Sequence, residues 1–153
     1  MQSVSLSPRE LRVGTLNQLA DTCRDAEIEL RRSASRVRGR DARDLLRRSA
    51  LELSRLAHEL HTEVRLLGGD AASKSADSSG KRALYAVDSG TDAAGDEAPL
   101  AGCQVLLEGA RRAYERVIVE GVPSDLEPLL RSHHEALKES LARLERLCPG
   151  VRS

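Results

Sequence analysis

Apolar residues recur along this chain in four stretches, at steps of three and four residues. The first two stripes run through Leu16, Leu19, Cys23, Ala26, Leu30 and Val37, and through Leu46, Leu53, Leu56, Leu60, Val64 and Leu67. The other two run through Leu100, Cys103, Leu107, Ala110, Tyr114 and Val117, and through Leu126, Leu130, His133, Leu137, Leu141, Leu144 and Cys148. This spacing places one apolar stripe on each of four helices. It predicts an all-α four-helix bundle.

Capping residues and glycines predict where the first helix begins. Residues 7–10, Ser-Pro-Arg-Glu, favour a short helical turn, and Gly14 interrupts it. Thr15 and Gln18 then form a second capping box, from which the first long helix extends over residues 16–38.

The other three helices carry signals of the same kind. We expect Asp41 to cap the second helix and Gly68 to end it in a left-handed conformation. The third helix begins near Pro99 and ends before Gly121. Residues 124–127, Ser-Asp-Leu-Glu, form a capping box for the fourth helix.

Connection lengths predict how the helices are arranged. The tight connection at 38–40 makes the first two helices antiparallel neighbours. Residues 70–98 form a long crossover, rich in Ala, Ser, Asp and Gly, with one apolar island at 82–87. Such a crossover returns the chain to its starting end, so that the second and third helices run parallel, as in the ferritin-like bundle. The expected organisation is an N-terminal arm over 1–14, the bundle over 15–148 and a tail over 149–153.

The amino-acid composition argues against some classes of binding partner. The 24 basic and 24 acidic residues give a net charge of zero, which argues against nucleic acid, because duplex binding needs a concentrated basic face. The two tyrosines cannot build a stacking platform for bases. No apolar run approaches the roughly 18 residues that a membrane-spanning helix needs. The partners we expect are a second copy of the chain or another protein, and neither a nucleic acid nor a membrane.

Location follows from the N-terminal sequence and the cysteines. The first ten residues lack the basic and apolar regions of a secretory signal. Cys23, Cys103 and Cys148 form an odd set without CxxC spacing, which is typical of reduced thiols. We therefore expect a cytoplasmic protein, in which Cys103 and Cys148 lie near one another at one end of the bundle.

Three segments carry a resemblance to a known family: Leu16-Asn17-Gln18-Leu19 leading into Cys23-Arg24-Asp25, Leu66-Leu67-Gly68-Gly69-Asp70, and Ala113-Tyr114-Glu115 before Val122-Pro123. In order and spacing they resemble an uncharacterised bacterial family of short ferritin-like four-helix bundles, classed as a domain of unknown function. The resemblance spans roughly residues 16–147. It implies the bundle fold, a bacterial cytosolic setting, a stress-associated role and no established activity. The chain departs from the family in the crossover, where an aromatic-containing helix is usual and only Leu84-Tyr85 remains.

A ferritin-like di-iron site needs a Glu-x-x-His motif on each of two helices. The residues three positions before His61, His133 and His134 are His58, Leu130 and Arg131, so both motifs are missing. The expected topology nevertheless brings Cys23, His61, Tyr114 and His133 to a comparable height. A thiolate and two imidazoles can hold zinc or copper. The sequence thus offers one candidate metal site, formed by Cys23, His61 and His133.

The same residues have a simpler interpretation, in which Tyr114 donates its hydroxyl proton to a neutral, buried His133.

Three glutamates flank the stripes by one position, where a carboxylate reaches solvent or pairs with arginine: Glu27, Glu108 and Glu115. A phosphorelay histidine is a poor match for His134, because Lys138 follows at a spacing of four and Glu139 replaces the required glycine.

No motif predicts a catalytic centre. The chain contains no GxSxG, no Gly-rich phosphate loop and no HExxH. We therefore expect a non-enzymatic binding or scaffold module without a cofactor, and the alternative is a degenerate ferritin-like bundle that binds zinc, copper or iron. Four outward apolar residues are candidates for a dimer contact: Leu51, Leu66, Val105 and Val119.

Overall fold

The computed structural model describes residues 7–69 and 95–147, and over these residues it contains four α-helices and no strand. The helices are α1 (Pro8–Ala34), α2 (Arg40–Leu66), α4 (Glu97–Glu120) and α5 (Glu127–Leu147). The prediction of an all-α four-helix bundle is confirmed. Residues 1–6, the crossover segment 70–94 with its apolar island, and residues 148–153 with Cys148 lie outside the described residues.

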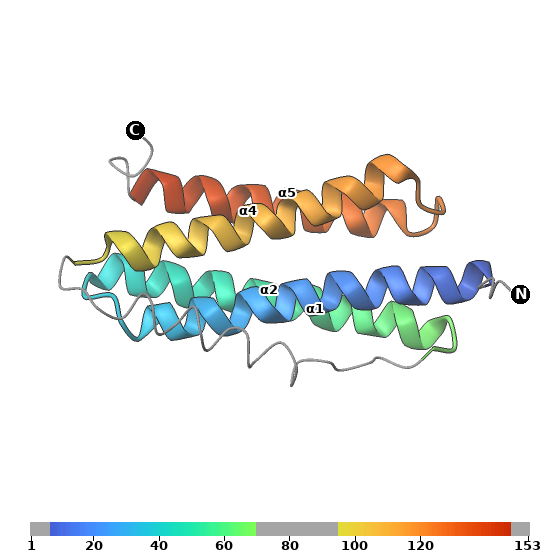
Figure 1. Cartoon of the computed structure of the whole chain (residues 1–153), viewed down its shortest axis with the longest axis horizontal. Helices are drawn as coiled ribbons and strands as arrows, with labels where there is room; N and C mark the ends of the chain where they lie inside the picture. Colours follow the sequence, from blue (N-terminus) through green and yellow to red (C-terminus); the bar gives the residue numbers. More distant parts are fainter. Residues whose placement is uncertain (1–6, 70–94, 148–153) are drawn as a thin grey trace, which may run out of the picture.

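Two helical hairpins pack against each other (Figure 1). α1 lies along α2 and α4 lies along α5, while α1 also packs on α4 and α2 on α5. Hence α1 and α5 occupy one diagonal of the bundle, and α2 and α4 occupy the other. Figure 1 shows α2 and α4 running in the same direction, each antiparallel to its two neighbours. None of the four described helices combines the length and the apolar character that crossing a membrane requires.

The core consists almost entirely of leucine and alanine from the four stripes. Every stripe residue within the described ranges is buried, except Leu67 and Val117, which are half-buried. Fully burying one leucine stabilises the fold by about 2 kcal/mol, so this dry interior is the main source of stability. Both exceptions lie near the end of the bundle at which α1 begins and α4 meets α5.

The start of α1 differs from the prediction. The helix begins at Pro8 and continues through Gly14, so the separate N-terminal turn and the capping box at Thr15 are wrong. Ser7 and Glu10 form the capping box: the Glu10 N–H donates to Ser7 Oγ at 3.1 Å, and the Ser7 N–H donates to Glu10 Oε1 at 2.9 Å. A glycine within a helix costs only about 1 kcal/mol, which this cap and the packing of the first turns offset.

The first turns of α1 are held by the end of α2. Gly68 has φ 82°, as predicted for a left-handed C-cap, and the Gly69 N–H donates to the Val64 carbonyl at 3.0 Å. Val13 packs so closely on Gly69 that a Cβ there would lie 2.8 Å from the valine methyl groups. Gly69 therefore lets α2 end directly against α1.

The start of α2 is capped by a residue far away in the sequence. Its N-cap is Gly39 and not Asp41. Asp96, which precedes α4, accepts the Arg38 N–H on Oδ1 at 2.8 Å and the Gly39 N–H on Oδ2 at 2.9 Å. These two backbone hydrogen bonds, the one from Arg38 foremost, hold the pKa of Asp96 below its ordinary value. One carboxylate thus satisfies backbone donors of the α1–α2 connection and fixes the start of α4 against it.

The fourth helix also begins later than its capping box predicts. α5 starts at Glu127, after a turn over 124–126. Pro128 consequently falls in the first turn of the helix. Backbone N–H groups have no helical partner there, so the proline removes no hydrogen bond.

We predict that Asp96→Ala destabilises the protein by about 1 kcal/mol, because two backbone donors lose their charged acceptor. Asp96→Asn, which keeps one acceptor oxygen, should lose less. Urea denaturation followed by circular dichroism measures both. Asp125→Ala, at an exposed aspartate of the α4–α5 turn, is the matched control and should change little. Equal stabilities for the Asp96 and Asp125 variants would contradict the capping role.

Candidate functional site

In the described part of the chain, a polar network takes one residue from each of the four helices. Cys23 of α1, Tyr114 of α4 and His133 of α5 are buried, and Glu59 of α2, with 34% of its side chain exposed, reaches the network from the surface. The Tyr114 hydroxyl lies 2.8 Å from His133 Nδ1 and 3.5 Å from Cys23 Sγ. The other imidazole nitrogen, Nε2, lies 2.7 Å from Glu59 Oε1. The predicted hydrogen bond between Tyr114 and His133 is confirmed.

The pKa shifts fix the direction of these hydrogen bonds. Burial acts to raise the pKa of Glu59, but hydrogen bonds from His133 and Arg55 outweigh it and hold that pKa below its ordinary value. Burial lowers the pKa of His133 despite the opposing bond to Glu59, so the imidazole is neutral at neutral pH. Nε2–H therefore donates to the Glu59 carboxylate, and Nδ1 accepts the Tyr114 proton.

The remaining member of the network is the Cys23 thiol, which donates to the tyrosine oxygen when Tyr114 gives its own proton to His133. Burial raises the pKa of Cys23 to about 12, and burial also raises the pKa of Tyr114 well above its ordinary value. Cys103, the second described thiol, is buried too, and its pKa is raised to about 11. A thiol attacks as its thiolate, so neither cysteine is a nucleophile near neutral pH. The predicted neighbour of Cys103, Cys148, lies outside the described residues.

His61 stands apart from this network. Burial lowers the pKa of His61, and Arg24 of α1 together with Arg65 and His58 of its own helix lower it further, while Asp21 of α1 acts to raise it. Of the three predicted metal ligands, the structure brings Cys23 and His133 to the same tyrosine hydroxyl and places His61 elsewhere. Within residues 7–69 and 95–147, no three His, Cys, Asp or Glu side chains converge on a point where they could hold a metal ion.

The three flanking glutamates form ion pairs with arginines of their own helices. Glu27 pairs with Arg31 at 3.0 Å, and Glu108 and Glu115 both pair with Arg111. The sequence analysis expected each carboxylate either to reach solvent or to pair with an arginine, and the observed arginine partners lie on the same helix as the glutamate. His134 is mostly buried, with 16% of its side chain exposed and Nε2 3.9 Å from Glu115. A phosphorelay histidine needs an accessible ring, which this one does not offer.

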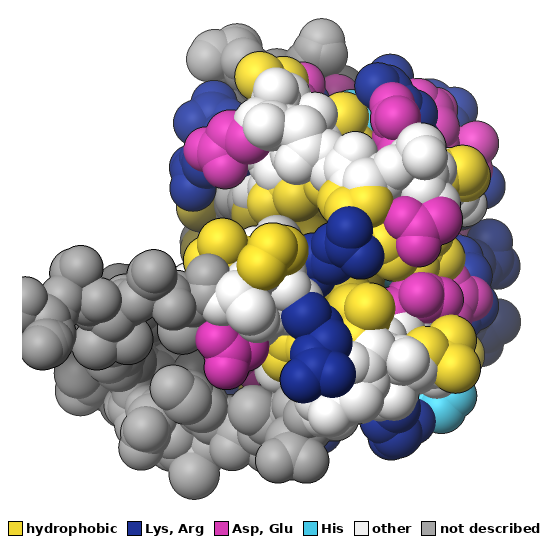
Figure 2. Space-filling model, turned by 90° about the vertical axis from the view of Figure 1, so that its right-hand side faces the viewer, with side chains coloured by type: hydrophobic (Ala, Val, Ile, Leu, Met, Phe, Trp, Pro, Cys, Tyr) yellow, Lys and Arg dark blue, Asp and Glu magenta, His cyan; other side chains and the backbone are white. Residues whose placement is uncertain are grey.

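A groove opens at the end of the bundle where α1 begins. Figure 2 looks onto this end and shows hydrophobic side chains gathered between the two hairpins, with basic side chains beside them. The groove has a volume of about 570 Å³. It is lined by Leu11, Arg12, Thr15, Leu16, Gln18, Leu19, Asp21 and Thr22 of α1, by Ala113, Arg116, Val117 and Glu120 of α4, and by residues 121–123, Leu126 and Leu130.

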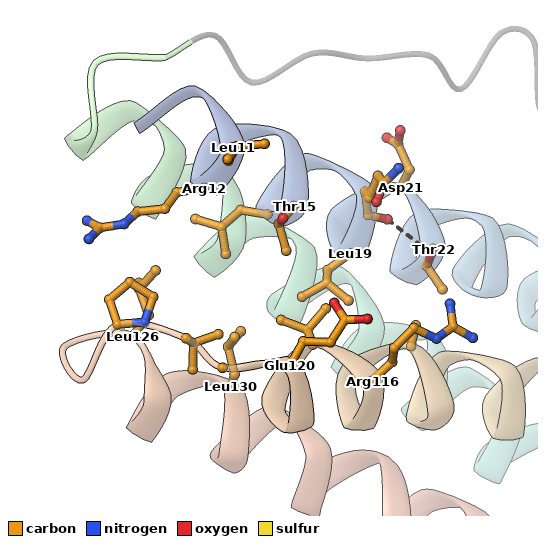
Figure 3. A pocket seen from close by; sticks show the side chains of 17 residues that line it. Leu11, Arg12, Thr15, Leu19, Asp21, Thr22, Arg116, Glu120, Leu126 and Leu130 are labelled. Atoms are coloured by element: carbon orange, nitrogen blue, oxygen red, sulfur yellow. Dashed lines mark hydrogen bonds between the residues drawn. The ribbon is translucent and has the colours of Figure 1, made fainter. Parts of the chain in front are cut away.

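Side chains from both walls point into the groove (Figure 3). Thr15 and Leu19 extend from α1 toward Leu126 and Leu130 on the opposite wall. Four charged residues border it: Arg12, Asp21, Arg116 and Glu120. Within the described part of the chain none of these four takes part in an ion pair, whereas ion pairs cover much of the remaining surface of α1, α2, α4 and α5.

The four predicted dimer-contact residues are all exposed, from 63% at Leu51 to 80% at Val119. Leu51 and Leu66 lie on α2, while Val105 and Val119 lie on α4. These two helices occupy opposite corners of the bundle, so the four residues do not form one surface.

Sequence reasoning missed Glu59 and the groove. Glu59 flanks the stripe of α2 by one position, next to Leu60, and was not assigned a partner. The signal was present, since a buried neutral imidazole has two nitrogens to satisfy and Tyr114 serves only one of them. The groove had no comparable signal, because its walls combine a helix start, a helix end and a turn.

A family model described as Domain of unknown function (DUF2383) matches residues 12–120. The match covers most of α1 and all of α2 and α4, and it ends before α5. Cys23, Glu59 and Tyr114 therefore lie within the matched region, and His133 lies outside it. None of the curated proteins compared with this chain matches it.

We predict that Tyr114→Phe destabilises the protein by roughly 1–3 kcal/mol, because the buried His133 Nδ1 loses its only donor and the Cys23 thiol loses its acceptor. Chemical denaturation measures the loss. Cys23→Ala removes only the weak thiol donor and serves as the comparison, with an expected smaller effect. A change below about 0.5 kcal/mol in Tyr114→Phe would show that the network is not a buried, water-free one.

Proposed function

The chain belongs to the DUF2383 family of domains of unknown function, and we propose that it is a non-enzymatic helical bundle that binds a protein partner in the groove. The observation that carries this proposal is the groove itself, a hollow of about 570 Å³ at one end of the bundle, lined by both apolar and charged side chains.

The lining supports binding rather than catalysis. Binding pockets typically have volumes of about 300–1,000 Å³ and are lined by apolar side chains with a few polar groups that fix orientation. The groove lies over the buried side chains of Leu19, Leu126 and Leu130, and the half-buried Val117 and Val122 add apolar surface to it. Arg12, Arg116 and Glu120 supply charges that form no ion pair with another described residue. Charges of this kind are available to a partner at little cost, because no existing ion pair has to be broken.

The buried network supports the non-enzymatic part of the proposal. Catalysis by a nucleophile needs an activated group that a substrate can reach. Cys23 and His133 are fully buried, and the raised pKa of the thiol, about 12, keeps it protonated. The network therefore serves the packing of the four helices.

The cellular setting remains part of the proposal. Two unpaired, buried thiols, Cys23 and Cys103, are compatible with a reducing cytoplasm. The bacterial origin, the ferritin-like relationship and a stress-associated role rest on the resemblance given above. Self-association through Leu51 and Leu66 or through Val105 and Val119 is a further proposal, in which each pair would form a separate contact.

The second candidate function is the degenerate ferritin-like metal site. One observation favours it: Cys23, Tyr114 and His133, from three helices, meet at the Tyr114 hydroxyl, and Glu59 holds the far imidazole nitrogen as carboxylates hold metal-binding histidines. Against it, a zinc, copper or iron ion would have to displace protons from a thiol and a phenol whose pKa values are both raised.

We predict that the uncharged apolar probe 1-anilinonaphthalene binds the folded protein in the groove. Thr15→Arg, which places a long charged side chain between the walls, should lower the probe affinity at least fivefold. Val119→Arg introduces the same charge at an exposed position outside the groove and should leave the affinity unchanged. Amide shifts of groove residues in NMR spectra locate the probe. Equal loss in both variants, or shifts confined to other faces, would remove the support for a binding groove.

Elemental analysis separates the two candidate functions. After incubation with Zn²⁺, Cu²⁺ or Fe²⁺ and removal of free metal, the binding-module proposal expects no stoichiometric ion. One equivalent retained by the wild type and lost in Cys23→Ala would establish the metal-binding alternative. The Cys103→Ala variant is the matched control, since Cys103 is a buried thiol outside the network.

A further inference from the structure

Exposed charges are distributed unequally between the two helical hairpins. In the α1–α2 hairpin, over residues 7–69, ten arginines and three acidic residues are exposed. In the α4–α5 hairpin, over residues 95–147, six basic and seven acidic residues are exposed. The other seven carboxylates of the first hairpin are half-buried. A chain with equal numbers of basic and acidic residues therefore presents one basic layer, formed by α1 and α2 (Figure 1).

Half of these arginines lie on α2. The exposed residues of this helix are five arginines, two aspartates, one histidine and two leucines. Spacings of three, four and seven residues place six of them on one side of the helix, which we call the α2 face: Arg40, Arg47, Leu51, Arg55, His58 and Arg65. Arg48 and Leu66 lie at its edge. Of the five arginines, Arg55 alone forms an ion pair with another described residue.

Two leucines project among the arginines of the α2 face. Leu51 is 63% exposed and lies one turn from both Arg47 and Arg55, while Leu66 is 75% exposed and follows Arg65. The two leucines are about 22 Å apart along the helix at 1.5 Å per residue. A partner that covers this face has to accept positive charge and two separate apolar side chains.

The charges of the α2 face disfavour a second copy of the chain as that partner. Packing two α2 faces against each other would bring the arginines of both copies together, and juxtaposed like charges oppose association.

The shape of the α2 face and its leucines favour a lipid surface over a nucleic acid. The arginines extend over about 37 Å of helix, from Arg40 to Arg65, and a duplex curves away from a helix of this length. Its phosphate backbone also offers no apolar contact to Leu51 or Leu66. Stacking on single-stranded bases needs exposed aromatic rings, and Tyr114, the one Tyr, Trp or Phe within the described ranges, is buried.

A bilayer with anionic lipids satisfies both kinds of side chain. Arginines near such a surface are attracted by the negative head groups, and clusters of four to eight basic residues are typical of this contact. The guanidinium group forms paired hydrogen bonds with phosphate. Apolar side chains of a helix that lies in the plane of the surface enter the boundary between head groups and acyl chains.

We propose that the α2 face binds the surface of a membrane that contains anionic lipids, with its arginines at the lipid phosphates and with Leu51 and Leu66 inserted between the head groups. The balanced composition argued against a membrane partner, but burial makes the exposed charge of this hairpin basic. This contact is separate from the binding groove, to which α2 contributes no residue.

Co-sedimentation of the full chain with lipid vesicles tests the proposal. Vesicles of equal parts phosphatidylserine and phosphatidylcholine should bind the protein at low salt, and vesicles of phosphatidylcholine alone should not. Each arginine near an anionic surface contributes roughly fivefold to partitioning, so Arg47→Glu combined with Arg48→Glu should lower the partition coefficient at least tenfold. Leu51→Asp should lower it about fivefold, because the inserted side chain becomes charged.

Matched controls carry the same changes on the other hairpin. Arg143→Glu combined with Arg146→Glu alters the net charge equally at two exposed positions of α5. Val105→Asp introduces an acid at a position of α4 that is 70% exposed. Both controls should bind the anionic vesicles nearly as well as the wild type, and circular dichroism should show that every variant is folded.

Several results would overturn the membrane contact. Among them are no binding to the anionic vesicles at low salt, equal losses in the α2 and α5 double variants, and equal binding by Leu51→Asp and Val105→Asp. If vesicles are not bound while polyglutamate or a DNA duplex is bound through Arg47 and Arg48, the partner is a soluble polyanion. A dimer that Leu51→Asp abolishes, without vesicle binding, would assign the α2 face to a second copy.

Discussion

The buried hydrogen bonds of His133 set the relative height of the four helices. A buried neutral imidazole needs an acceptor for one nitrogen and a donor for the other, and here they come from Glu59 on α2 and Tyr114 on α4. Tyr114 in turn faces Cys23 on α1. A core of leucine and alanine alone tolerates many near-equivalent packings. Directional hydrogen bonds do not, so sliding any one helix by a turn would leave buried polar atoms unpaired.

The same network separates two parts of the bundle with different properties. Thr22 precedes Cys23, Ala113 precedes Tyr114, and Leu130 lies one turn before His133, and all three line the groove. The leucines of the stripes are buried on both sides of the network, including Leu16, Leu19 and Leu130 on the groove side. On the groove side the stripe of α4 ends with the half-buried Val117, and the two hairpins leave the hollow between them. A rigid polar layer thus supports the open end, which is the arrangement that a preorganised binding site needs.

The stripes could be predicted from sequence because burial of a helix face depends on periodicity, which is local. Helix ends depended on distant residues and were predicted less well. Asp96 supplies the cap that Gly39 lacks, across a long stretch of sequence, and the packing of Val13 on Gly69 supports a helix start that the glycine at position 14 argued against. In the network, Tyr114 and His133 were predictable as a pair from their stripe positions. Glu59 was not, because its stripe position predicts a solvent-facing carboxylate and only its reach across to α5 brings it to His133.

Many of the charged side chains on the helix faces differ from those around the groove in whether they form ion pairs. On the helix faces, arginines and glutamates three and four residues apart neutralise each other, as Arg111 does with Glu108 and Glu115. Such pairs contribute only about 0.3–0.5 kcal/mol each, and they leave little charge for an external partner. Around the groove, Arg12, Asp21, Arg116 and Glu120 form no ion pair with another described residue, although Arg116 and Glu120 stand at the spacing at which an ion pair could form. In a protein with no net charge, recognition cannot rely on long-range attraction of an oppositely charged partner. Under the proposed function, recognition would instead rely on direct contacts with the charged side chains that border the groove.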